Sequence, residues 1–145
     1  TVMKLHTAGH ILDYAVQVVY GRVVDTLGAY HGPPKPYVEY VADPPTEDML
    51  NEIEEIANKV VREGRAVRFL TVPKEELRKV AFNAPNLARL PEASEYRVVV
   101  IDGINGIPCT GTHVRNTKEV GKISVTDVAK KEGYFRLYYT VEGTQ

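Results

Sequence analysis

The segment that decides the fold class is KISVTDVAKKEGYFRLYYTV, residues 122–141. Two stretches of it, Lys122–Val128 and Tyr134–Val141, are rich in β-branched and aromatic residues, and a turn-forming run at Lys130–Gly133 separates them. This pattern predicts a β-hairpin. Because a turn this short joins only antiparallel neighbours, the C-terminal part of the chain is expected to form an antiparallel sheet.

Upstream of the hairpin, helical and extended patterns do not alternate regularly. Apolar spacing predicts one helix over Leu5–Leu27 and a second that Thr46 caps and Gly64 ends. Runs of β-forming residues predict strands at Tyr37–Val41, Val67–Val72 and Arg97–Ile101, the last being the most apolar and therefore central in a sheet. The expected fold class is α+β: a single domain over residues 1–145, with a largely antiparallel sheet packed with helices.

Composition fits a globular domain and excludes several other classes. The chain has 145 residues, of which 43% are hydrophobic and 26% charged. Its longest apolar run, residues 98–101, is far shorter than the roughly 20 residues of a membrane span, and no secretion signal is visible, so no membrane partner is expected. The single cysteine, Cys109, cannot form an internal disulfide, which is typical of a reducing, cytoplasmic location.

Charge is distributed unevenly between the two halves of the chain. Residues 1–61 hold four basic and nine acidic side chains, whereas residues 62–145 hold 14 basic and 10 acidic ones. A basic surplus of this kind can bind phosphates, although an ordinary solvated charged face gives the same pattern.

The histidines and the cysteine suggest a metal site. His6 and His10 are four residues apart on the first predicted helix, and Cys109 and His113 have the same spacing in a Gly-containing loop. Residues i and i+4 lie on one face of a helix, so His6 and His10 can share one ion, and the Gly-containing loop can bend so that Cys109 and His113 converge. An imidazole–thiolate set favours Zn(II). The fourth histidine, His31, lies in a predicted turn without such a partner and is expected at the surface, with contact to substrate as the less favoured alternative.

Each ligand pair also has a simpler interpretation. An isolated histidine on a helix is usually structural, and an isolated cysteine is usually a small buried apolar residue. Four protein ligands would close a zinc site, whereas a catalytic zinc usually keeps one open position. Asp13 and Gln17, on the turns after His10, are candidate partners of the ligands and equally ordinary helix residues.

These residues carry a family resemblance. The segments His6–His10 and Cys109–His113 resemble the paired HxxxH and CxxxH motifs of the alanyl-tRNA editing domain, and Val114–Ile123 continues the similarity. That domain occurs in alanyl-tRNA synthetases and in freestanding AlaX-type proteins, of which the short form is the most similar. This sequence departs from the motifs at Gly9, where the family often has Thr, and at Thr110, where it often has Gly.

The resemblance implies a fold like the editing domains of threonyl- and alanyl-tRNA synthetases, and hydrolysis of the ester between a wrong amino acid and tRNA(Ala) at a zinc-containing site. A synthetase pocket for alanine rejects similar amino acids only about 10- to 200-fold, so a second site is needed to remove them. Serine is the expected cargo, and glycine is possible. The region Ala29–Pro34 departs from the serine-binding segment of bacterial synthetases, which leaves the cargo open.

The resemblance also suggests roles for individual residues. Thr112, beside His113, is the candidate catalytic residue that would hydrogen-bond substrate or water, and stabilising the loop is its alternative role. Arg115 and Lys118 are expected to contact tRNA phosphates. Four roles are open for zinc: to activate water, to polarise the ester carbonyl, to anchor the free amino group of the aminoacyl moiety, or only to shape the pocket. Two alternative functions remain: a non-catalytic zinc-stabilised tRNA-binding module, and a deacylase for threonyl-type cargo.

Overall fold

The computed structural model describes residues 2–142 and confirms the α+β class. The elements follow the order α1 (Val2–Tyr20), β1 (Thr26–Tyr30), β2 (Tyr37–Tyr40), α2 (Glu47–Glu63), β3 (Val67–Pro73), η1 (Lys74–Glu76), α3 (Leu77–Val80), η2 (Leu87–Arg89), β4 (Glu95–Ile101), β5 (Asn105–Pro108), η3 (Thr117–Val120), β6 (Ile123–Lys130) and β7 (Phe135–Val141). Among these residues no helix combines the length and the apolar character that crossing a membrane requires.

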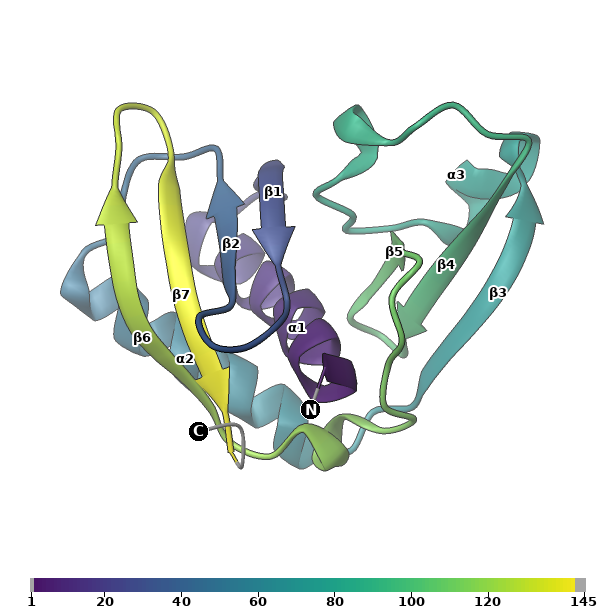
Figure 1. Ribbon diagram of the computed structural model, residues 1–145. Helices are drawn as coiled ribbons and strands as arrows, with labels where there is room; N and C mark the ends of the chain where they lie inside the picture. Colours follow the sequence, from purple (N-terminus) through teal and green to yellow (C-terminus); the bar gives the residue numbers. More distant parts are fainter. Residues whose placement is uncertain (1, 143–145) are drawn as a thin grey trace.

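The strands form two antiparallel sheets instead of one. The first sheet has the order β1-β2-β7-β6, and the second has the order β3-β4-β5. Figure 1 shows the two sheets on either side of α1, with β1 and β5 facing one another across the middle of the molecule. The predicted hairpin is β6–β7, and the predicted central strand is β4.

The first helix is shorter than the predicted span Leu5–Leu27, so that prediction is wrong beyond Tyr20. Gly21 adopts a left-handed conformation, φ 73°, and its N–H binds the carbonyl of Val18, which ends the helix. Helical apolar spacing continues past this point, but residues 26–30 pair with β2 instead. This pairing makes β1 an edge strand beside the middle of the molecule (Figure 1).

The second helix begins and ends as its sequence predicts. The hydroxyl of Thr46 accepts a hydrogen bond from the N–H of Met49 at 3.2 Å, and Gly64 ends the helix with φ 67°. Both caps satisfy backbone groups that a helix end leaves open.

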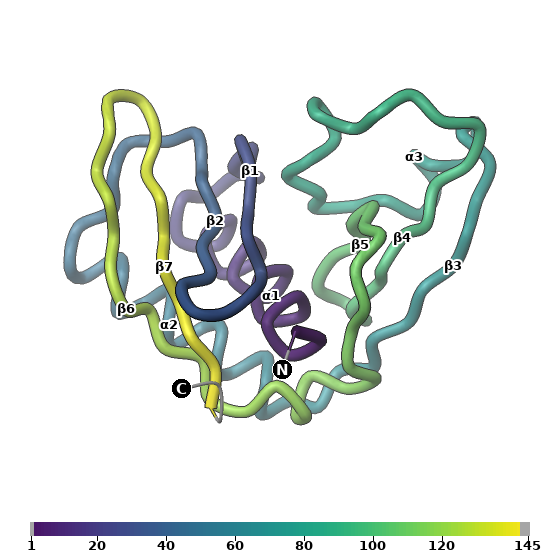
Figure 2. The backbone as a smooth tube through the Cα atoms, viewed as in Figure 1, coloured from purple at the N-terminus to yellow at the C-terminus, as the bar shows by residue number. Residues whose placement is uncertain are grey.

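One core joins the two sheets through α1. Leu5, Ala8 and Leu12 of that helix are fully buried, in one cluster with Leu137 of β7 and Val99 of β4. The backbone trace in Figure 2 shows that the chain passes from β5 through the η3 region to β6 below α1. The helix therefore contacts both sheets, and its N-terminal half lies beside the loop that follows β5.

Candidate metal centre and substrate cavity

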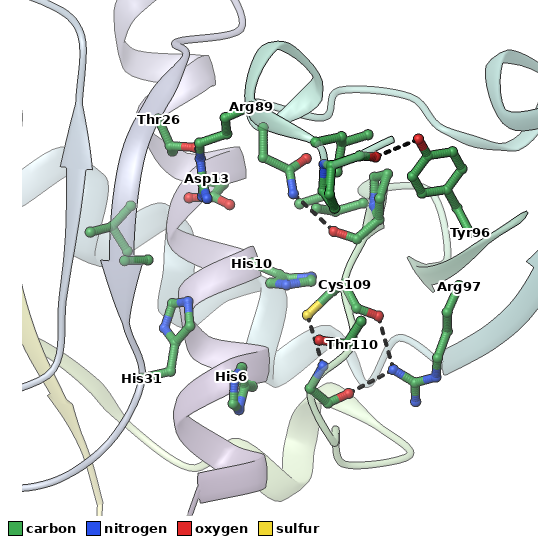
Figure 3. Close-up of a pocket in the computed structure, with 18 of the residues that line it drawn as sticks. His6, His10, Asp13, Thr26, His31, Arg89, Tyr96, Arg97, Cys109 and Thr110 are labelled. Atoms are coloured by element: carbon green, nitrogen blue, oxygen red, sulfur yellow. Dashed lines mark hydrogen bonds between the residues drawn. The ribbon is translucent and has the colours of Figure 1, made fainter. Parts of the chain in front are cut away.

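A cavity of about 710 Å³ opens between α1, the β1 edge and the β4–β5 side of the molecule. On α1, His6, His10 and Asp13 line it, spaced three or four residues apart so that they lie on one helix face. His31 follows β1 and Cys109 follows β5, so residues far apart in the sequence meet around one space (Figure 3).

Three of the four predicted ligands converge at one end of this cavity. Ligand atoms of His10, Cys109 and His113 all lie within 4.8 Å of one another. The Sγ atom of Cys109 is 3.5 Å from Nε2 of His113, and the rings of His10 and His113 have centroids 4.6 Å apart. Two imidazoles and one thiol in this arrangement can hold a metal ion.

The protonation and hydrogen bonding of these side chains suit the binding of a cation. The Nδ1 atom of His10 is buried without any hydrogen-bond partner, which is costly unless another group satisfies it. Burial lowers the pKa of His113 to about 3 and that of His10 well below 6.5, so both imidazoles are neutral and free to coordinate. Burial also raises the pKa of the Cys109 thiol, so a bound cation would have to displace its proton.

Thr7, between the two helix histidines, orients His113. Its hydroxyl donates to the carbonyl of Met3 at 3.1 Å and therefore accepts from Nδ1–H of His113 at 3.0 Å. The proton is thus on Nδ1, and Nε2 faces Cys109 as an unprotonated ligand atom. An outer hydrogen bond of this type is a regular feature of histidine metal ligands.

The Cys109 loop is held by Arg97, the first residue of the strand predicted over Arg97–Ile101. A guanidinium nitrogen of Arg97 donates to the carbonyls of Cys109 at 3.1 Å and Gly111 at 2.7 Å. Figure 3 shows both bonds at the loop. Because two carbonyls are fixed by one planar group, the thiol keeps its position relative to α1.

His6, the fourth predicted ligand, lies outside the group of three. Its ring centroid is 5.6 Å from that of His113, and its Nδ1–H donates to the carbonyl of Val2 at 3.2 Å. Its Nε2 is directed at Gly111, where a Cβ atom would come within 2.6 Å of it. Coordination by His6 therefore stays a prediction, with Nε2 as the atom available for it.

The prediction that His31 lies at the surface is wrong, because it lines the cavity with its ring centroid 4.9 Å from that of His6. The hydroxyl of Tyr139 donates to the carbonyl of Leu5 at 2.7 Å, so it accepts from Nδ1–H of His31 at 2.6 Å. A Cβ atom on Gly9 would collide with the His31 ring. The departure from the family motif at Gly9 thus makes room for this imidazole.

The other end of the cavity is also polar. The hydroxyl of Tyr40 donates to the Asp13 carboxyl at 2.6 Å, and Arg89 donates to the hydroxyl of Thr26 at 3.1 Å. Burial raises the pKa of Asp13 to about 7, although the hydrogen bond from Tyr40 opposes this shift. Gln17, the other predicted partner of the ligands, is not among the residues that line the cavity.

The remaining predicted residues lie outside the main cavity. Thr112 and Arg115 are exposed and line a neighbouring groove, whereas Thr110 lines the cavity itself. Lys118 is exposed, and its aliphatic chain lies over Gly64. Three contributors were missed as members of the site: Thr7, Arg97 and Tyr139. Only Thr7 carried a sequence signal, its place inside the histidine motif.

The chain is similar in sequence to several known proteins. Residues 96–138 match the family described as the threonyl and alanyl tRNA synthetase second additional domain. The chain is 31% identical over 142 residues to the alanyl-tRNA editing protein AlaX-M of Methanosarcina acetivorans and 30% identical over 147 residues to that of Saccharolobus solfataricus. It is 33% identical over 146 residues to an alanine–tRNA ligase of Ignicoccus hospitalis.

These alignments include nearly all of this chain, 96%, 97% and 99% in that order, but less of the relatives. They span 57% and 59% of the two AlaX-M proteins and 16% of the ligase. The similarity therefore concerns one segment of each relative.

Proposed function

We propose, from the premise that this chain is a homologue of the AlaX-M editing proteins and of a segment of alanine–tRNA ligases, that it hydrolyses mischarged tRNA(Ala) in trans. One observation carries the proposal: ligand atoms of His10, Cys109 and His113 meet within 4.8 Å at the wall of a cavity large enough for an aminoacyl group. The proposal treats residues 1–145 as one editing domain, and a cytoplasmic location follows from the substrate.

The donor set supports Zn(II) as the metal, with His6 as a further ligand through Nε2. A zinc ion held by these side chains would polarise the ester carbonyl or lower the pKa of a bound water. If His6 does not coordinate, three protein ligands leave the open position that hydrolytic zinc sites keep.

The protein side chains supply positioning for the reaction. Thr7 holds the His113 ring, and Arg97 holds the Cys109 loop, so the ligands are preorganised on a rigid helix and a fixed loop. Tyr139 holds His31 with Nδ1 protonated, which leaves its Nε2 as a neutral hydrogen-bond acceptor. Since burial lowers the pKa of His31 to about 4, this acceptor persists at neutral pH.

Seryl-tRNA(Ala) is the proposed substrate, and glycyl-tRNA(Ala) is the alternative. The polar end of the cavity, with Asp13, Thr26 and Arg89, can pair with a seryl hydroxyl. An alanyl group has no hydroxyl to form these hydrogen bonds, which is the physical basis for sparing correctly charged tRNA.

The proposal is tested by deacylation of seryl-, glycyl-, threonyl- and alanyl-tRNA(Ala), with bound zinc measured in the same preparations. We expect hydrolysis of the seryl ester and sparing of the alanyl ester. Cys109→Ala and His10→Ala should bind zinc much more weakly and lose hydrolysis, whereas Thr126→Ala, an exposed position on β6, should change neither property. Hydrolysis that persists without zinc would contradict metal catalysis, and no hydrolysis of any ester would favour the non-catalytic binding module.

The proposed catalytic role of Thr112 has its own comparison. Thr112→Val should slow hydrolysis if that hydroxyl contacts substrate or water. Thr110→Val is the matched control, because Thr110 belongs to the same loop but lines the main cavity. A loss confined to Thr110→Val would transfer the role to that residue.

A further inference from the structure

A second groove adjoins the cavity at Arg97, a residue that lines both spaces. It has a volume of about 560 Å³ and extends from the metal ligand His113 and its neighbour Thr112 to strand β3. The groove therefore begins at the end of the cavity where the metal ligands lie.

The groove contains an aromatic ring that no core contact explains. Phe69 is 64% exposed, the most exposed large apolar side chain among residues 2–142. It lies on the edge strand β3 opposite Val99, which is buried. The guanidinium carbon of Arg97 lies 4.3 Å from the centre of the Phe69 ring, while the same group binds the carbonyls of the Cys109 loop. The ring is thus held against a fixed cation beside the metal ligands.

The charge of the groove has one sign. Arg68, Arg97 and Arg115 line it, and no carboxylate does. Arg68 forms an exposed ion pair with Asp102 at 2.6 Å, and exposed ion pairs of this kind are weak. Arg115 is exposed and forms no ion pair within the described part of the chain. A ligand with both a planar ring and a negative charge complements these groups.

We propose that this groove binds an unpaired nucleotide near the 3′ end of the tRNA, with its base stacked on Phe69 and its phosphate between Arg115 and Arg68. The inference rests on the proposed function, because an ester at the metal centre requires the adjoining nucleotides to leave the cavity nearby. Unpaired bases bind proteins by stacking on aromatic rings, and arginines hold the backbone. The second groove, next to His113, provides both an exposed aromatic ring and arginines.

The test uses fluorescence anisotropy with the full chain and two uncharged tRNA(Ala) transcripts, one intact and one lacking its unpaired 3′-terminal nucleotides. We expect Phe69→Ala to weaken binding of the intact transcript about tenfold and to leave the truncated one unchanged. Phe69→Trp should retain binding. Phe82→Ala is the matched control, since Phe82 is 41% exposed and lies outside the groove. Arg115→Gln should reduce the salt dependence by about one phosphate contact.

In the anisotropy experiment, three outcomes would overturn the inference: equal loss for both transcripts, no loss with Phe69→Ala, or no binding of tRNA by the unsubstituted chain. Sedimentation of the same variants tests whether the groove instead binds a second copy of the chain. A dimer that Phe69→Ala dissociates would make the groove a contact between copies and reject the RNA assignment. Binding that depends on Phe69 without hydrolysis would support the groove and contradict the proposed function. Hydrolysis with a KM that Phe69→Ala leaves unchanged would support the proposed function and contradict nucleotide binding in the groove.

Discussion

Zinc binding should release about one proton per ion at pH 6.0, a value that follows from the burial of the three converging ligands. The Cys109 thiol has a pKa above its ordinary value of 9.0, so it is fully protonated at this pH and loses one proton when it coordinates. The pKa of His113 is about 3 and that of His10 is well below 6.5, so neither imidazole has a proton to release.

The same ligands with ordinary pKa values would give a different number. An imidazole with a pKa near 6.5 is about three-quarters protonated at pH 6, so two of them would raise the release to about 2.5 protons. A zinc-bound water, with a pKa near 7, adds only about 0.1 proton at this pH. The two descriptions therefore differ by about 1.5 protons.

Isothermal titration calorimetry in weakly coordinating buffers of different ionisation enthalpy measures this number. Cys109→Ala should reduce the release to nearly zero and weaken zinc binding. A release above two protons would refute the desolvated, neutral state of the imidazoles. An unchanged release in Cys109→Ala would show that the thiol is not a ligand.

Three further predictions concern the surroundings of the metal centre. Thr7→Val should weaken zinc binding about 10- to 100-fold, because the imidazole that Thr7 orients loses its hydrogen-bond acceptor; competition with a chromogenic chelator measures this, and an unchanged Kd contradicts it. The folded-state pKa of Asp13, about 7, lies above its ordinary 3.8, so ionisation of this one carboxyl should cost the metal-free chain about 3 kcal/mol of stability as the pH rises from 4 to 7, while the buried histidines, whose pKa values are lowered, contribute with the opposite sign. Asp13→Asn should abolish this loss in urea unfolding and the exposed Asp127→Asn should not; equal pH profiles would refute the burial of Asp13. Gly9→Ala should cost about 1–3 kcal/mol by displacing His31 and much less in a His31→Ala background, whereas additive costs would show that the two positions are independent.

The parts of the fold that the sequence predicted depend on local signals. The caps at Thr46 and Gly64 bound α2, and the turn after β6 forms the hairpin, because these features need only neighbouring residues. The first helix was predicted too long because its apolar spacing continues through Leu27. Pairing of residues 26–30 with β2 overrides that spacing, and such pairing is a tertiary effect that a window of sequence does not contain.

The same distinction applies to the site. Equal spacing in two histidine-containing segments was enough to predict that His10, Cys109 and His113 converge. It did not identify the groups that hold them, because Arg97 acts through carbonyl oxygens that every residue has. His31 was placed at the surface since its hydrogen-bond partner, Tyr139, is 108 residues away.

Gly9 and His31 are best understood as one structural change. At position 9 the sequence lacks the side chain that the family motif often has, and the His31 imidazole occupies the adjacent space. The cavity wall therefore keeps its packing while it gains a hydrogen-bonding ring beside His6. Because an altered cavity wall is where cargo preference would change, variants that compare cargoes should replace both positions together. A single substitution at either position changes the packing and the polarity of the wall at once, and so cannot assign a change in specificity to one of them.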